Sequence, residues 1–138
     1  MEVSERGVRI PGPVALEGIL HLPEGETPRA GVAVCHPHPL YGGTMLNPVV
    51  AALAREAARH GLAALRFNFR GTGRSDGEFG GGPEEAHDLG AALAWLEERL
   101  GPGAPLGVAG YSFGAAVAVV YAAGGGRGPA VRALALVG

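Results

Sequence analysis

The stretch Gly110-Tyr111-Ser112-Phe113-Gly114 decides the fold of this chain, because it reads G-x-S-x-G between a strand-like run and a helix-like run. Apolar residues from Leu106 to Ala109 precede it, and an alanine-rich run from Ala115 to Ala123 follows it. In a sharp strand-to-helix turn the central serine exposes its hydroxyl, and the flanking glycines avoid Cβ clashes. The pattern therefore predicts a nucleophile elbow with Ser112 at its tip and a positive φ at that residue.

The residues after this turn lack the usual partners of a nucleophilic serine. Between Phe113 and Gly138 the sequence has no Asp, Glu or His. A triad in the chain order serine, acid, histidine therefore cannot be completed within these 138 residues. We expect no aligned relay from Ser112 through a histidine to a carboxylate in this chain.

Composition and charge indicate one globular domain. A chain of 138 residues is the usual size of a single domain. A net charge of -2 and 6% aromatic residues argue against a nucleic-acid partner. The single cysteine, Cys35, allows no intrachain disulfide, which fits a reducing compartment. Without a signal-like N-terminus or an apolar run of 18 residues, we expect a cytoplasmic protein with no membrane partner.

Strand-like runs alternate with segments of helical period. The predicted strands are Val3 to Ile10, Val14 to Leu22, Ala30 to His36, Leu62 to Phe69, Leu106 to Ala109 and Val131 to Val137. The predicted helices are Pro48 to His60, Pro83 to Leu100 and Phe113 to Ala123. The turn Pro11-Gly12-Pro13 allows the first two strands to form an antiparallel hairpin. The remaining order predicts an α/β fold with a mostly parallel, doubly wound sheet covered by helices on both faces.

Ligands of such sheets bind beyond the carboxyl ends of the strands. Two loops with unusual chemistry lie at strand ends, namely the elbow and the histidine-rich segment from His36 to Thr44. These two loops form the candidate site.

Three motifs carry a resemblance to a known family. HPHPLYGGTM (36–45), FNFRGTGRSDGEF (67–79) and GYSFG (110–114) each follow a predicted strand. In this order and at this spacing they resemble the α/β-hydrolase fold, in particular its small, lidless, dienelactone-hydrolase-like branch, from about Gly18 onward. The resemblance implies that residues 1–138 are one domain, incomplete at its C-terminus, that lacks the last two strands and the terminal helix of the fold.

The resemblance also implies roles for individual residues. Ser112 takes the nucleophile position and the backbone N–H of Phe113 the first oxyanion-donor position. The second donor comes from the histidine-rich loop, where two prolines lack an N–H, so His38 is the first choice and Leu40 the second. The residues expected to shape the site are His36, Tyr41, Gly42, Gly43, Gly110, Tyr111 and Gly114.

Other residues have competing interpretations. His36 and His38 have the chemistry of a catalytic base, but loop histidines beside proline more often hydrogen-bond locally. Asp76 beside Gly77 reads as a turn former rather than a catalytic acid, and Asp88 lies in the first turns of a helix.

Neither a cofactor nor a metal is expected. Gly71-Thr72-Gly73 follows a strand but lacks the third glycine and the immediate helix of a dinucleotide site. Histidines and carboxylates show no metal-ligand spacing.

The sequence leaves two hypotheses for the function. In the first, the complete gene product is a serine hydrolase that acts on a small carboxylic ester or thioester through an acyl-enzyme at Ser112, with the acid and base beyond residue 138; for the 138-residue chain alone, activity stays open. In the second, the chain is a non-catalytic binding or assembly module that retains the elbow. If the chain is an N-terminal portion, its bare sixth strand predicts that the isolated 138 residues self-associate or are only marginally stable.

Overall fold

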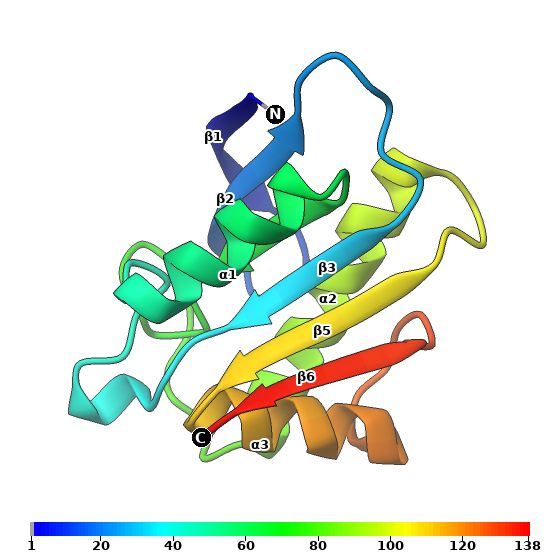
Figure 1. Cartoon of the computed structure of the whole chain (residues 1–138). Helices are drawn as coiled ribbons and strands as arrows, with labels where there is room; N and C mark the ends of the chain where they lie inside the picture. The colour runs from blue at the N-terminus through cyan, green and yellow to red at the C-terminus, as the bar shows by residue number, and fades with distance from the viewer. Residues whose placement is uncertain (1) are drawn as a thin grey trace.

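A single six-stranded sheet runs through the molecule, and the computed structural model describes residues 2–138 (Figure 1). Its strands, in the spatial order β1-β2-β4-β3-β5-β6, are β1 (Val3–Ile10), β2 (Leu16–Pro23), β4 (Ala63–Phe67), β3 (Gly31–Cys35), β5 (Leu106–Tyr111) and β6 (Ala133–Val137). β1 and β2 form the predicted antiparallel hairpin, β2 also pairs antiparallel with β4, and the other three pairings are parallel. The predicted fold class is confirmed.

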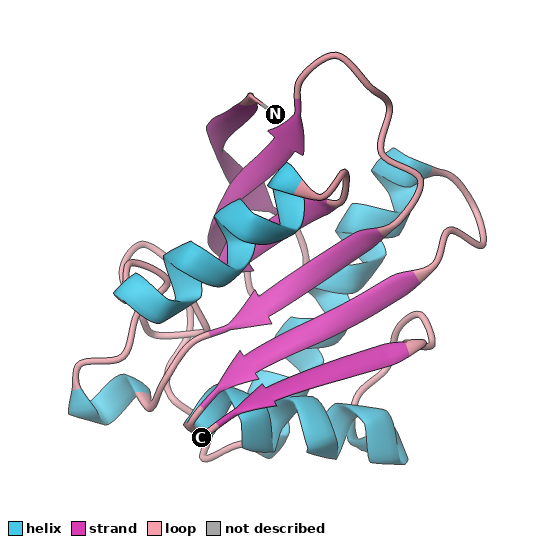
Figure 2. Cartoon of the chain, in the orientation of Figure 1, coloured by secondary structure: helices cyan, strands magenta, loops and turns pink. Residues whose placement is uncertain are grey.

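Three α-helices cover the sheet from both sides (Figure 2). α1 (Pro48–Arg59) lies on one face, while α2 (Pro83–Leu100) and α3 (Phe113–Val120) lie on the opposite face. Short helical turns, η1 (Pro39–Tyr41) and η2 (Tyr121–Gly125), follow β3 and α3. The predicted continuation of the third helix to Ala123 is wrong, because the chain widens into η2 after Val120 and turns at Gly124, whose φ is 97°.

The start of α1 follows from its local sequence. The Asn47 side-chain carbonyl accepts the N–H of Val49 at 2.9 Å and that of Val50 at 3.3 Å, and Pro48 occupies the first helical position. Gly61, with φ 90°, follows the helix end. These capping signals are local, which is why the sequence predicts both ends closely.

The second and last strands begin later than predicted, at Leu16 and Ala133. The fourth strand also ends earlier than predicted, at Phe67 rather than Phe69. The N–H of Asn68 still bonds to the carbonyl of Glu17, but that of Phe69 donates to the ring of His36 instead of a neighbouring strand. At the carboxyl edge of the sheet, the His36 side chain thus replaces a strand carbonyl as the acceptor for the N–H of Phe69.

Two apolar layers hold the sheet between its helices. The larger lies under α2 and α3 and includes Phe67, Phe69 and the predicted stripe of Leu89, Leu93 and Leu96. The smaller lies under α1 and consists of Val34, Val50, Ala54, Ala64 and Ala109, with partly buried neighbours. Among residues 2–138, no helix is long and apolar enough to cross a membrane.

Candidate functional site

Ser112 stands at the junction of β5 and α3 in a strained backbone conformation. Its φ is 58° and its ψ is -116°, and it is the one non-glycine residue with positive φ in the described chain. Its N–H donates to the carbonyl of Val137 at 2.9 Å, and its carbonyl accepts the N–H of Ala115 at 3.0 Å. The residue is exposed. The predicted positive φ is therefore confirmed, and hydrogen bonds to β6 and α3 hold it.

The flanking glycines allow this turn to close. A Cβ atom at Gly110 would meet the carbonyl of Gly114, and one at Gly114 would meet the carbonyl of Cys35 at the end of β3. Strand, helix and the neighbouring strand therefore approach one another more closely than any larger residue permits.

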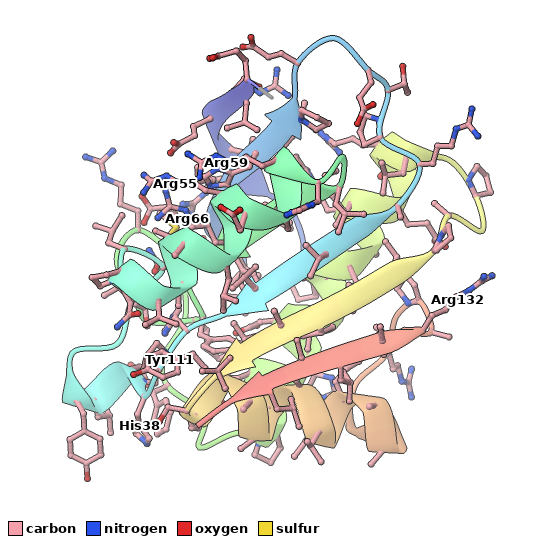
Figure 3. The ribbon with its side chains drawn as sticks, in the orientation of Figure 1. His38, Arg55, Arg59, Arg66, Tyr111 and Arg132 are labelled. Atoms are coloured by element: carbon pink, nitrogen blue, oxygen red, sulfur yellow. The ribbon has the colours of Figure 1, made fainter. Side chains whose placement is uncertain are left out.

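The histidine-rich loop leaves the sheet directly beside this turn, because β3 pairs with β5 and Cys35 is in register with Gly110. Figure 3 labels His38 and Tyr111 at this carboxyl edge. The expected convergence of the two loops is thus present. Tyr111 itself packs beside the apolar layer under α1.

His36 is fully buried and has both ring nitrogens engaged. Its Nε2 accepts the N–H of Phe69 at 3.0 Å, so the proton lies on Nδ1, which donates to the carbonyl of Pro37 at 2.7 Å. Burial lowers the pKa of His36 to about 4. With no free nitrogen, this ring is a structural link between two loops, not a base.

That link also orients the next peptide. In a trans peptide the carbonyl and the N–H point in opposite directions, so the Pro37 carbonyl, bonded to the buried His36 ring, turns the His38 N–H away from that ring. The Leu40 N–H, by contrast, donates to His38 Nδ1 at 3.2 Å. Of the two expected donors in this loop, His38 is the one whose N–H has no acceptor within residues 2–138.

The rest of the loop folds back on His38. Its carbonyl accepts the N–H of Gly43 at 2.9 Å and that of Tyr41 at 3.1 Å. Gly42, with φ 84°, ends η1, and a Cβ at Gly43 would meet the Pro37 carbonyl. Tyr41 is 87% exposed, with its ring 4.8 Å from that of His38.

The two candidate carboxylates are engaged elsewhere. Asp76 pairs with Arg9 at 2.9 Å on the surface. Asp88 is buried and accepts the backbone N–H of Arg70 at 2.9 Å and its guanidinium at 2.7 Å. In the part of the chain that the structure describes, no hydrogen-bonded line joins Ser112 to a histidine and an acid. Nor does any group of three or more metal-ligating side chains occur there.

Sequence reasoning missed two residues near this site. The ring of Phe79 lies 4.9 Å from that of His38 and 5.8 Å from that of Phe113. The buried Glu85 accepts the N–H of Gly80 and of Gly82 and so shapes the loop that carries Phe79. A glutamate three residues after a helix-starting glycine is a capping signal that points to Glu85; the position of Phe79 depends on tertiary packing.

Comparisons with known proteins place these features in context. The family described as X-Pro dipeptidyl-peptidase (S15 family) matches residues 17–136. A protein of Rickettsia prowazekii (strain Madrid E), named only as uncharacterized, is 45% identical over 94 residues, which make up 67% of this chain and 40% of that protein.

Solved structures share the fold. A lidless α/β serine hydrolase from Xanthomonas campestris has a TM-score of 0.79 and 37% identity over 87% of this chain and 56% of that one. An α/β serine hydrolase homologue from Coxiella burnetii has a TM-score of 0.77 and 41% identity over 84% and 57%. An esterase from Pyrococcus furiosus has a TM-score of 0.71 and 26% identity over 84% and 45%. The chain thus spans about half the length of the proteins it matches.

Proposed function

The chain belongs to the X-Pro dipeptidyl-peptidase (S15) family and has the α/β-hydrolase fold, and from this premise we propose that the full-length protein is a serine hydrolase of small carboxylic esters or thioesters. The resemblance inferred from the three motifs is confirmed at the level of family and fold. The observation that carries the proposal is the exposed Ser112 with φ 58° at the β5–α3 junction, beside the loop after β3.

The proposed chemistry is acyl transfer. The Ser112 hydroxyl attacks the substrate carbonyl, and the N–H groups of Phe113 and His38 stabilise the resulting oxyanion. Collapse of that intermediate expels the alcohol or thiol and leaves an acyl-enzyme, which water then hydrolyses. Since no described histidine is free to accept the serine proton with an acid behind it, we assign the base and the acid to segments beyond residue 138.

An ester or thioester is proposed over an X-Pro peptide because of the relatives. One of the similar structures is an α/β serine hydrolase without a lid, another is an α/β serine hydrolase homologue, and a third is an esterase. A site without a lid suits small, water-exposed acyl groups.

The test uses the full-length protein, with p-nitrophenyl acetate as the ester and an X-Pro p-nitroanilide as the peptide analogue. We expect hydrolysis of the ester, a loss of at least about 10³-fold in kcat for Ser112→Ala, and fluorophosphonate labelling of Ser112 detected by mass spectrometry. Hydrolysis that survives in Ser112→Ala would exclude this serine as nucleophile. Preference for the anilide would move the substrate class to peptides.

The second function is a non-catalytic binding or assembly module. It predicts neither ester hydrolysis nor fluorophosphonate labelling in the full-length protein. The same two measurements therefore separate the two functions.

A further inference from the structure

Three aromatic rings meet above the carboxyl ends of three neighbouring strands. His38 comes from the loop after β3, Phe79 from the loop after β4, and Phe113 from the turn after β5. Their ring centroids lie 4.7 Å apart for His38 and Phe113, 4.9 Å for His38 and Phe79, and 5.8 Å for Phe79 and Phe113. Each ring thus contacts the other two.

Two of these residues carry the proposed oxyanion donors. The N–H groups of His38 and Phe113 belong to different loops, so no covalent geometry sets the separation between them. Their rings are in contact, in addition to the β3–β5 pairing and the close approach of Gly114 to the carbonyls of Cys35 and His36. The ring of Phe79 packs against the rings of both His38 and Phe113.

Side chains of α2 hold the loop that carries Phe79. The carboxylate of the buried Glu85 accepts the N–H of Gly80 at 2.8 Å and that of Gly82 at 2.7 Å, on the C-terminal side of Phe79. At the start of the same loop, Asp88 accepts the N–H of Arg70. Two buried carboxylates of one helix therefore anchor the segment on either side of the ring.

We propose that Phe79 is a positioning residue that, through the rings of His38 and Phe113, sets the separation of the two oxyanion N–H donors. This inference rests on the proposed function. Donors placed for the transition state stabilise charge that develops only there, so their misplacement lowers kcat more than it raises KM.

The first test is kinetic and uses the full-length protein with p-nitrophenyl acetate. Phe79→Ala removes the ring, and we expect kcat to fall between about 10-fold and 100-fold with KM within about 2-fold, because displacement of a catalytic group by about 1 Å costs about 10²-fold. Phe79→Tyr keeps the ring, which is only half-buried, and should retain kcat within about 3-fold.

The matched control is Trp95→Phe, a change in the core beneath α2 that leaves the three rings intact. If kcat falls equally in Trp95→Phe and Phe79→Ala, the effect is one of general stability and the proposal is wrong. A rise in KM with unchanged kcat in Phe79→Ala would make Phe79 a substrate contact and would also overturn it.

A second test needs no activity. In crystal structures, Phe79→Ala should change the distance between the backbone nitrogens of His38 and Phe113, whereas Trp95→Phe should leave it unchanged. An unchanged distance in Phe79→Ala refutes the positioning role whatever the protein catalyses. A changed distance in a protein that hydrolyses no ester would refute the proposed function and leave the structural coupling standing.

Discussion

Ser112 has a positive φ that the sequence predicts, and the residue is exposed at the junction of β5 and α3. A positive φ at a non-glycine residue costs roughly 1–3 kcal/mol, and it persists only where the surroundings over-determine it. Here the determinants are the hydrogen bond from Ser112 to Val137, the helix that begins at Phe113, and the two glycines that let the turn close. Contacts from several parts of the fold therefore hold Ser112 in its strained conformation.

Gly114→Ala should destabilise the protein, because the added Cβ would meet the carbonyl of Cys35 in a backbone that cannot move without disturbing β3. We expect a loss of about 1–3 kcal/mol in the free energy of unfolding, measured by urea denaturation. Gly7→Ala in β1 is the matched control, since nothing lies within 4 Å of its Cβ position. Equal stability of Gly114→Ala and the unmodified protein would disprove the close approach.

Two buried histidines predict how stability depends on pH. Burial lowers the pKa of His36 to about 4, and burial together with the charge of Arg66 does the same for His21. The Arg66 Nε–H donates to His21 Nε2 at 2.9 Å, which leaves His21 Nδ1 without a partner within residues 2–138. Glu5 and Arg55 also face this pair.

The direction in which stability changes with pH follows from the protons that the two histidines take up on unfolding. Between pH 6.5 and pH 4 these two histidines are protonated in the unfolded chain and neutral in the folded one, so the free energy of unfolding should fall as pH falls through this window. We expect a loss of about 2 kcal/mol per histidine between pH 7 and pH 5, measured by urea denaturation. His21→Gln should show about half the pH dependence of the unmodified protein. An unchanged dependence in that variant would count against the buried, neutral state of His21.

At the scale of elements, the loop between β4 and α2 is held to its helix by Asp88 and Arg70. The carboxylate is buried, and it accepts both the backbone N–H and the guanidinium of Arg70. Burial raises the pKa of Asp88, while the Arg70 hydrogen bonds oppose that shift. Removal of the Asp88 carboxylate therefore leaves the largely buried guanidinium of Arg70 with the exposed Glu84 as its remaining ion-pair partner, and leaves the Arg70 N–H without its acceptor.

Asp88→Ala is expected to lower the free energy of unfolding by about 3–5 kcal/mol. Glu84→Ala supplies the comparison, because Glu84 binds the same guanidinium at 3.2 Å from an exposed position and should cost at most about 1 kcal/mol. Calorimetry of both variants measures the difference. Similar losses in the two would show that burial does not set the strength of this network.

At the scale of the whole molecule, the sheet has an exposed edge at β6. β6 pairs with β5 alone within the described strands, and Leu134 and Leu136 on it are 40% and 50% exposed. An apolar hollow lies over β3, β5 and β6 and is lined in part by Val32, Gly107, Ala133 and Ala135. Unpaired apolar strand edges favour association.

The 138-residue chain by itself should therefore associate in solution, as measured by size exclusion with light scattering. Ala135→Lys places a charge on the exposed strand and should shift the population toward monomer. Leu46→Lys, at another exposed apolar side chain, should not. A stable monomer of the unmodified chain would refute the expectation.

The sequence by itself determined what depends on near neighbours in the chain. The cap at Asn47, the leucine stripe of α2 and the glycines around Ser112 are local patterns, and each predicted its element and the conformation of its key residue. The fold class followed from the alternation of strand-like and helical runs along the chain and from the family resemblance that the three motifs carry.

Only the tertiary structure decided which groups share a hydrogen bond or a ring contact. His36 bridges Phe69 and Pro37, Asp88 binds Arg70, and Phe79 reaches His38 and Phe113 across adjacent strand ends. Such contacts depend on the strand order, which brings β4, β3 and β5 side by side although α1 and α2 separate them in sequence. Periodicity within one segment carries no information about that distance, so only the packing of the sheet places His38 and Phe79 beside Phe113.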